Sequence, residues 1–179
     1  MKATGIVRRI DDLGRVVIPK EIRRTMRIRE GDPLEIYTDK DGEVIFKKYS
    51  PMGEMASFAL SFCETLAKTT GRSVAVSDRD TIVAAAGTAR RELMDKRLSP
   101  EIEDIMEKRQ IIHDEDGSRN IAICEHVEKY IVAVAAPIIT EGDVSGCVIF
   151  VGSAGEKTGD TEFKLAQTVA GFLSRQMES

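Results

Sequence analysis

The start of the chain is rich in β-forming residues. Residues 3–10 and 15–18 are two such stretches, and a turn signal at residues 12–14 separates them, so the sequence predicts two short strands. A helix is predicted to follow from Lys20 to Arg27, because Pro19 suits the first position of a helix, where its missing N–H leaves no donor unpaired.

A β-hairpin is predicted after this helix. Gly31 stands where a helix stop is expected, and the apolar runs 34–38 and 43–49 are joined through Asp41-Gly42, a strong hairpin signal. The resulting order, β-β-α-β-β within about 50 residues, exposes sheet edges and offers little core. We therefore expect its strands to pair with those of a second chain.

From residue 54 onward, longer helices and strands succeed one another. Pro51 and Gly53 break the preceding strand, which predicts domains of residues 1–50 and 51–179. A helix over 54–70 carries an apolar stripe and ends at Gly71. The remaining expected elements are strands at 73–77, 81–86, 120–125, 130–139 and 144–151, a helix begun by Ser99-Pro100, and a final helix at 160–177. Strands enclosed by helices fit an α/β sensor fold.

The charge is distributed unevenly between the two parts. The chain of 179 residues has a net charge of −4. Residues 1–50 carry 12 cations and 9 anions, a net charge of +3, whereas residues 51–179 carry the other 14 cations and 21 anions, a net charge of −7. A polyanion would be attracted to the first part and repelled by the second.

Much of the positive charge belongs to the predicted helix. At 100° per residue Ile22 and Met26 share one side, and four cations occupy an arc of about 100° on the other side. These cations are Lys20, Arg23, Arg24 and Arg27. A solvated surface explains such a face as well as a phosphate-binding role does, but residues 1–29 hold nine cations against three anions, which favours the phosphate-binding role.

The motifs in this part resemble a known family. The sequence TGIVRRIDDLGRVVIPKEIRRTMRIREGDPLEIYTDKDGEVIFKKY, and above all its core GRVVIPKEIRR, is similar to the swapped-hairpin DNA-binding domain of the AbrB family. The acidic segment beyond Pro51 is similar to the GAF-type domain appended to some AbrB-type regulators. The resemblance implies an α+β chain, with a dimeric swapped-hairpin β-barrel followed by an α/β GAF-like domain.

This resemblance also implies a function and a set of contacts. The function is that of a cytoplasmic, sequence-tolerant DNA-binding regulator of transcription in sporulation and forespore gene expression, acting on double-stranded DNA as a homodimer or homotetramer. The DNA-contacting arginines of the family fall on Arg8, Arg15, Arg23 and Arg24. The further candidates are Arg9, Lys20 and Arg27. Two of these side chains have alternative partners, because Arg15 can pair with Asp11 or Asp12 and Arg24 with Glu21.

No sequence signal indicates catalysis, a metal or a cofactor. Cys63, Cys124 and Cys147 are far apart in sequence and are interpreted as reduced core residues, and His113 and His126 have no partner at ligand spacing. The glycine-rich residues 151–155 are interpreted as a loop. An unidentified small-molecule ligand of the GAF-like part remains a hypothesis.

Neither a membrane span nor export is expected. The N-terminus has no apolar stretch of signal-peptide length, and the longest apolar run, 130–139, is interrupted by Pro137. An antitoxin-like interaction module of the same swapped-hairpin fold is the alternative function. A folded second part counts against it, because antitoxin tails are short and disordered.

Overall fold

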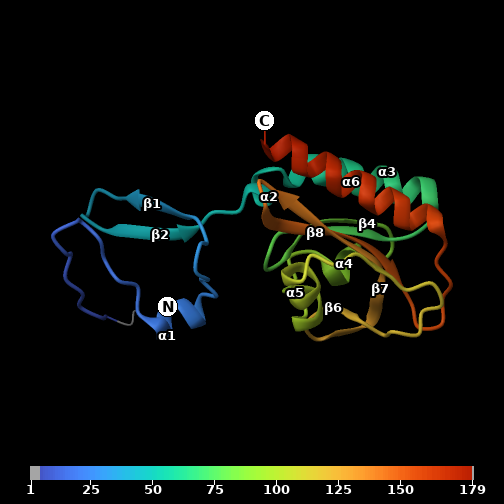
Figure 1. The fold of residues 1–179 in the computed structure, drawn as a ribbon, viewed down its shortest axis with the longest axis horizontal. Coiled ribbons are helices and arrows are strands. Elements are labelled where there is room, and N and C mark those ends of the chain that lie inside the picture. The colour runs from blue at the N-terminus through green and yellow to red at the C-terminus, as the bar shows by residue number, and fades with distance from the viewer. Residues whose placement is uncertain (1–4, 179) are drawn as a thin grey trace. The chain divides into compact units, whose positions relative to one another are not determined.

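The computed structural model describes residues 5–178, which form two compact units that meet between Tyr49 and Ser50. The first unit contains one helix and an antiparallel two-stranded sheet, namely α1 (Lys20–Thr25), β1 (Leu34–Thr38) and β2 (Val44–Lys48). The predicted hairpin is confirmed, and its register runs from Leu34 opposite Lys48 to Thr38 opposite Val44 (Figure 1). Gly42 turns the chain with a φ of 85°, a conformation that glycine adopts without strain.

The two strands predicted at 3–10 and 15–18 do not form, as far as residues 5–18 are described. These segments are extended around a turn at residues 12–14 and belong to no sheet. A strand needs a neighbour for its backbone N–H and C=O groups, and the hairpin of the same chain does not supply one. A pairing partner for these segments is not within the described part of this chain.

Helix α1 is shorter than the sequence predicts. It ends at Thr25, with Met26 as its C-cap, and Arg27 has a φ of 51° in the left-handed region. Pro19 is the N-cap residue rather than the first helical residue, because its ψ of 146° is extended. The helix therefore stops well before Gly31, whose φ of 83° belongs to a later turn.

The second unit is a six-stranded antiparallel sheet with helices on both faces. The order along the sheet is β4-β3-β8-β7-β5, and β6 pairs with β7. The strands are β3 (Val74–Ser77), β4 (Ile82–Ala86), β5 (Ile112–His113), β6 (Ala122–Cys124), β7 (Val127–Thr140) and β8 (Asp143–Gly152). The helices are α2 (Pro51–Glu54), α3 (Ala56–Thr70), α4 (Arg90–Leu93), α5 (Pro100–Glu107) and α6 (Asp160–Glu178).

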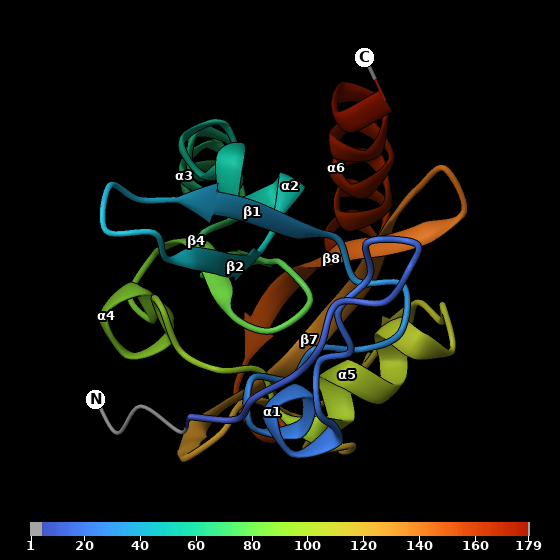
Figure 2. The same ribbon diagram turned by 90° about the vertical axis from the view of Figure 1, so that its left-hand side faces the viewer.

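The helices divide between the two faces of this sheet. In both ribbon views α3 and α6 lie side by side on one face, and α4 and α5 lie on the other (Figure 1, Figure 2). Along β8, Val148 and Phe150 point into the core under α3 and α6, whereas Cys147 and Ile149 point into the core under α4 and α5. This period of two explains why the strand reads as a continuous apolar run, since each face is buried against helices.

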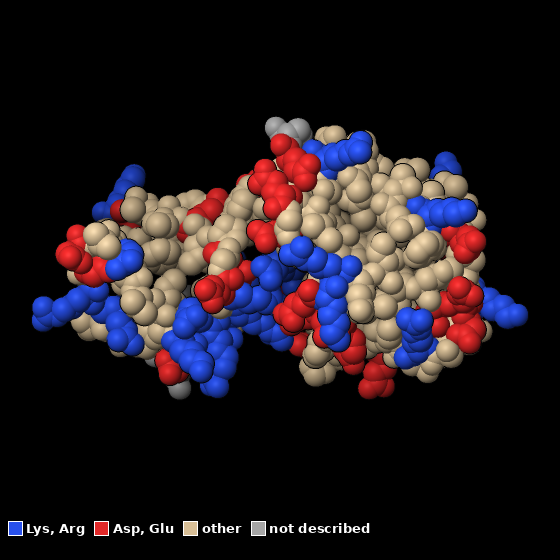
Figure 3. All heavy atoms as spheres, in the orientation of Figure 1, with Lys and Arg blue, Asp and Glu red and all other residues tan. Residues whose placement is uncertain are grey.

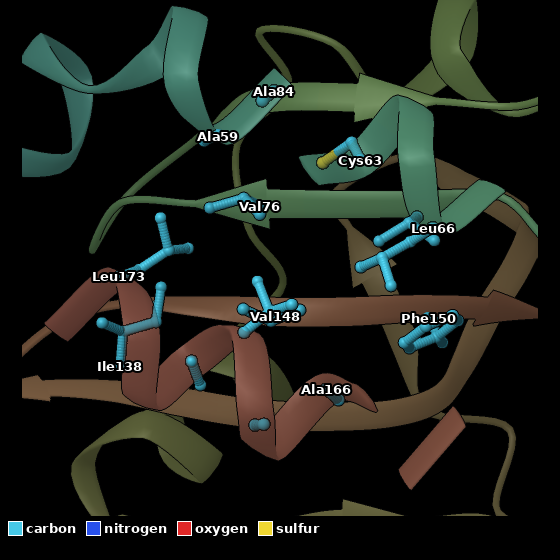
Figure 4. Close-up of a cluster of buried hydrophobic side chains, with 14 of the residues drawn as sticks. Ala59, Cys63, Leu66, Val76, Ala84, Ile138, Val148, Phe150, Ala166 and Leu173 are labelled. Atoms are coloured by element: carbon cyan, nitrogen blue, oxygen red, sulfur yellow. The ribbon is translucent and has the colours of Figure 1, made fainter. Parts of the chain in front are cut away.

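The core beneath α3 and α6 is closely filled by apolar side chains. Figure 4 shows Leu66 of α3 above Phe150 of β8 and Cys63 of α3 beside Val76 of β3, with Leu173 coming from α6. Four of these five side chains are fully buried, and Leu66 is 6% exposed.

Helical signals at the ends of elements predict the second unit well, with three exceptions. Ser99 caps α5 by accepting the Ile102 N–H at 3.2 Å, and Gly71 ends α3 with a φ of 73°, as predicted. The helix expected over 54–70 is confirmed over Ala56–Thr70, and a short helix that was not predicted, α2, precedes it. The short elements α4 and β5 were not predicted, because four and two residues are too few to show a period.

Candidate nucleic-acid interface

Helix α1 presents three cations to solvent. Lys20, Arg23 and Arg24 are exposed, and Figure 3 shows Lys and Arg side chains gathered over this helix. Arg23 Nε donates to the carbonyl oxygen of Ile18 at 3.2 Å, which ties the start of its guanidinium to the residue before the helix. The alternative partner of Arg24 is not engaged, because Arg24 and Glu21 form no ion pair in the described structure. Arg24 can therefore donate hydrogen bonds to a phosphate without first breaking such a pair.

Arg27 does not share the helical face that the sequence assigns to it. Its left-handed backbone follows the end of α1, so the rotation of 100° per residue no longer applies there. Lys48 of β2 holds this turn, because its Nζ donates to the Arg27 carbonyl oxygen at 2.8 Å and lies 3.6 Å from Asp32 Oδ2. No local sequence signal predicts this positioning role, since Lys48 and Arg27 are 21 residues apart.

Arg15 is paired with Asp11, one of the two alternatives open at the sequence level. Asp11 Oδ1 accepts the backbone N–H groups of Leu13 and Arg15, and Asp11 Oδ2 accepts Arg15 Nε at 2.8 Å. The backbone and then the guanidinium of Arg15 lower the pKa of Asp11. The Arg15 side chain nevertheless remains 69% exposed, and exposed pairs of this kind exchange partners at little cost. The pair orients the Arg15 side chain and leaves it accessible to a ligand.

The remaining candidates lie on the extended segment before this turn. Arg8 and Arg9 are both exposed, and their side chains make no hydrogen bond or ion pair within residues 5–178. The hydrogen bond from Asp11 N to Arg15 O, at 3.0 Å, closes the turn and folds this segment back toward Arg15. The first unit thus carries cations on α1 and on both sides of the turn.

The same unit also exposes apolar side chains. Val7 is 93% exposed and Val17 71%, and Pro19 is the only buried residue among residues 5–49. The other large exposed apolar side chains of the unit are Ile6, Ile10, Leu13, Val16, Met26, Ile36, Tyr37, Val44, Ile45 and Phe46. A surface this apolar in so small a unit is typical of one that is covered by a partner.

The three cysteines of the second unit are buried and free. Burial raises the pKa of Cys63 to about 12 and that of Cys124 to about 11, and it also raises the pKa of Cys147. These thiols therefore stay protonated and unreactive at neutral pH, as expected of core cysteines. Residues 5–178 contain no cluster of three or more His, Cys, Asp or Glu side chains that would suit a metal ion. None of the described helices combines the length and apolar character needed to cross a membrane.

Two family models match the chain. Residues 54–178 match the C-terminal domain of stage V sporulation protein T, a transcription factor, and residues 7–53 match the MazE bacterial antitoxin, which recognises a toxin. The GAF domain of a phosphoenolpyruvate-protein phosphotransferase from Acinetobacter covers 73% of the chain and 84% of its own length, with a TM-score of 0.56 at 12% identity. At that identity the likeness shows the fold alone, and it confirms the GAF-like α/β domain.

Curated relatives extend the match to both units. The transition state regulatory protein AbrB of Bacillus subtilis is 65% identical over 51 residues, which are 28% of this chain and 52% of that protein. Stage V sporulation protein T of Bacillus subtilis is 46% identical over 179 residues, which are 99% of each chain. The predicted resemblance and the predicted fold class are thereby confirmed, and the chain belongs to the stage V sporulation protein T family.

Proposed function

We propose that the chain is a DNA-binding regulator of transcription in sporulation, with residues 1–50 as its DNA-binding domain and residues 51–179 as its sensing and assembly domain. The observation that carries the proposal is the set of exposed cations on α1 and around the turn at residues 11–15. AbrB, with which this region is 65% identical, is a transition state regulator, and solved structures of its N-terminal part are described as a DNA recognition domain. That likeness supports the proposal that this chain binds DNA in the cytoplasm.

The proposed contact surface consists mainly of guanidinium groups. Arg8, Arg15, Arg23 and Arg24 are its principal members. Arg9, Lys20 and Arg27 are secondary members. A guanidinium offers a planar fork of donors to phosphate oxygens and guanine edges, and phosphate contacts position a protein without fixing a strict base sequence. This chemistry suits a regulator that tolerates varied operators.

Binding requires at least two copies of the chain in this proposal. The first unit exposes apolar side chains and has extended segments without strand neighbours, so a second copy with interleaved strands would satisfy both. Pairing would also place two basic surfaces in one complex, and each weak contact would then add to the other.

The outer sides of α3 and α6 are the proposed assembly surface of the second unit. Phe58 and Phe62 of α3 meet Phe172 of α6, with ring centroids 6.0 and 5.3 Å from the Phe172 ring. Phe58 is 39% exposed and Phe172 is 41% exposed, although both belong to a cluster of three aromatic rings. Aromatic side chains left half-exposed on two neighbouring helices fit a helical bundle between copies, which yields a dimer or tetramer.

The test is the salt dependence of DNA binding by the full chain. If four cations per chain meet phosphates in a dimer, about eight contacts form, and the logarithm of the association constant should fall against the logarithm of the salt concentration with a slope of about −7. Fluorescence anisotropy of labelled promoter DNA measures this slope. A slope near zero would exclude a contact led by phosphates.

An antitoxin-like role is the second candidate, because residues 7–53 match the MazE antitoxin model. In that role the exposed apolar segments of the first unit would cover a toxin. The second unit argues against it, since residues 54–178 form a folded domain rather than a short tail. Saturable, salt-dependent binding to DNA with no protein partner present would separate the two functions in favour of the regulator.

The second unit is proposed to sense a small molecule or a protein partner rather than to catalyse a reaction. Its buried thiols are protonated, and residues 5–178 contain no cluster of three or more His, Cys, Asp or Glu side chains suited to a metal ion. A ligand that binds the folded state raises its melting temperature, so a thermal-shift screen of metabolites on the full chain tests the sensing role.

A further inference from the structure

A second group of cations lies on the acidic half of the chain. Arg90, Arg91, Lys96 and Arg97 fall within one short segment made of α4 and the turn that follows it, and all four are exposed. We name these four residues the α4 cation cluster. Residues 51–179 have a net charge of −7, so the cluster departs from the charge of its own unit.

The segment that carries the cluster is fixed to an edge of the sheet. Arg97 forms a β-bridge with Thr81, and Ile82 N donates to the carbonyl oxygen of Lys96 at 2.9 Å. Asp95 N in turn donates to the Ile82 carbonyl oxygen at 3.1 Å. Because Ile82 begins β4, an edge strand, the cations stand on a defined backbone rather than on a loose loop.

The segment of residues 90–97 is itself positively charged, because it holds four cations and two carboxylates. Glu92 is occupied by the Tyr130 hydroxyl at 2.9 Å and by Lys129 Nζ at 3.5 Å, so an additional cation offsets its charge. Asp95 is the other carboxylate of the segment, and it is exposed. The four cluster side chains make no ion pair or hydrogen bond with any residue from 5 to 178. Some other cations of the unit are paired, as Arg72 is with Glu156 and Glu162 and Lys108 is with Asp104.

A short chain of contacts connects the cluster to the start of the second unit. Ser50, the first residue after the DNA-binding unit, donates its hydroxyl to Asp78 Oδ2 at 2.9 Å. Asp78 Oδ1 accepts the Thr81 N–H at 2.8 Å, and Thr81 is bridged to Arg97. These contacts join the backbone of the segment that carries the cluster to Ser50, the first residue of the second unit.

We propose that the α4 cation cluster is a second DNA contact surface, which binds backbone phosphates of the duplex held by the first unit. The inference rests on the proposed function of that unit. Arginine and lysine side chains bind phosphate oxygens without reading base sequence, so the cluster adds affinity and leaves operator choice to the first unit. A structural change in the sensing unit could then alter DNA binding directly. The reason is that α4 and the following turn contribute side chains to the apolar core that they share with α5.

The test compares two triple variants of the full chain on one duplex. The first variant is Arg91→Gln, Lys96→Gln and Arg97→Gln. Its duplex is about 40 base pairs long, or about 140 Å at 3.4 Å per base pair, so that it extends beyond the first unit. Each phosphate contact contributes about 0.9 to the salt slope of the association constant. With 1 M salt as the reference, the loss of one contact therefore weakens binding at 0.15 M salt about fivefold. We expect this variant to bind about 100-fold more weakly and its salt slope to be smaller in magnitude by about 2.7.

A matched control removes the same charge elsewhere on the same unit. Lys108, Arg109 and Arg119 are exposed and flank β5, at the edge of the sheet opposite β4. The variant Lys108→Gln, Arg109→Gln and Arg119→Gln should keep the wild-type salt slope, because only long-range charge is lost. Equal DNA binding by the two triple variants would overturn the proposal. That result is also the one expected if the cluster binds an acidic protein instead of DNA.

A third variant and one measurement on the wild type complete the test. Arg23→Gln with Arg24→Gln should lose binding whether or not the cluster contributes, so its failure to do so would count against the proposed function itself. The second measurement is the acetylation of Lys96 in the wild type, followed by mass spectrometry. It uses no variant, so its result does not depend on whether a variant folds. We expect bound duplex to protect Lys96 but not Lys108, and equal modification of Lys96 with and without DNA would refute the contact.

Discussion

Phe172 tests whether α3 and α6 form the interface between copies. A Phe side chain can bury about 200 Å², so a side chain that is 41% exposed leaves about 80 Å² for a partner. At about 25 cal/mol per Å², the change Phe172→Ala removes about 2 kcal/mol of interface per copy. In a symmetric dimer the residue appears twice, so the loss is about 4 kcal/mol, or about a thousandfold in the dissociation constant.

Sedimentation equilibrium of the full chain measures this loss directly. The wild type should sediment as a dimer or tetramer at micromolar concentration, and the Phe172→Ala variant should dissociate over that range. Circular dichroism should show an unchanged fold, because the ring covers the outer side of the helix and not the sheet. Binding of DNA should weaken in parallel, since two basic surfaces are no longer held together.

The neighbouring residue on α6 supplies the control. Leu173 is fully buried in the core under α3 and α6, so Leu173→Ala should lower the free energy of unfolding by about 2–5 kcal/mol. If Phe172→Ala destabilised the domain as much as Leu173→Ala while the assembly stayed intact, the aromatic cluster would be part of one domain's core. The interface assigned to α3 and α6 would then be wrong.

Three further predictions concern the first unit. The changes Arg23→Ala and Arg24→Ala should each weaken DNA binding with an unchanged circular dichroism spectrum, and wild-type binding at about 150 mM salt would contradict the role of α1. A fragment of residues 1–50 should sediment as a dimer, and a folded monomer at micromolar concentration would contradict strand interleaving. The pKa of Asp11 is lowered from 3.8, so its contribution to stability is present above that value and is lost as the pH falls through the lowered pKa. The change Arg15→Gln should raise this pKa part of the way back, as measured by NMR titration.

Elements with local signals were predictable from the sequence. Ser99 followed by Pro100 marks a helix start because the serine hydroxyl accepts a free N–H of the first turn, and the structure shows this hydrogen bond to Ile102. Gly71 marks the end of α3 because a left-handed residue closes many helices. In each case the information lies within a few residues, so no tertiary contact is needed to read it.

The errors arise where distant residues decide the local structure. Arg27 was assigned to the basic face of α1, but Lys48, 21 residues away, holds its carbonyl oxygen in a turn after the helix has ended. The strand expected over residues 15–18 depends on a pairing partner that the described part of one chain does not provide. Periodicity reports the face that a residue occupies within a regular element, and it does not report which other segment completes that element.

The first unit depends on its neighbours for stability as well as for binding. Pro19 alone is buried among residues 5–49, so a single copy gains little from the burial of apolar surface, which is the main term that opposes the chain entropy lost on folding. The second unit has two apolar cores of its own, one on each face of its sheet. It begins at Ser50, directly after the first unit, and Met52, two residues later, is fully buried. If the second units associate, two first units are joined to one assembly through a connection that is only a residue or so long, and their own pairing becomes an intramolecular step. A signal that strengthens association of the second units would then stabilise the paired DNA-binding surface without touching any DNA-contacting arginine.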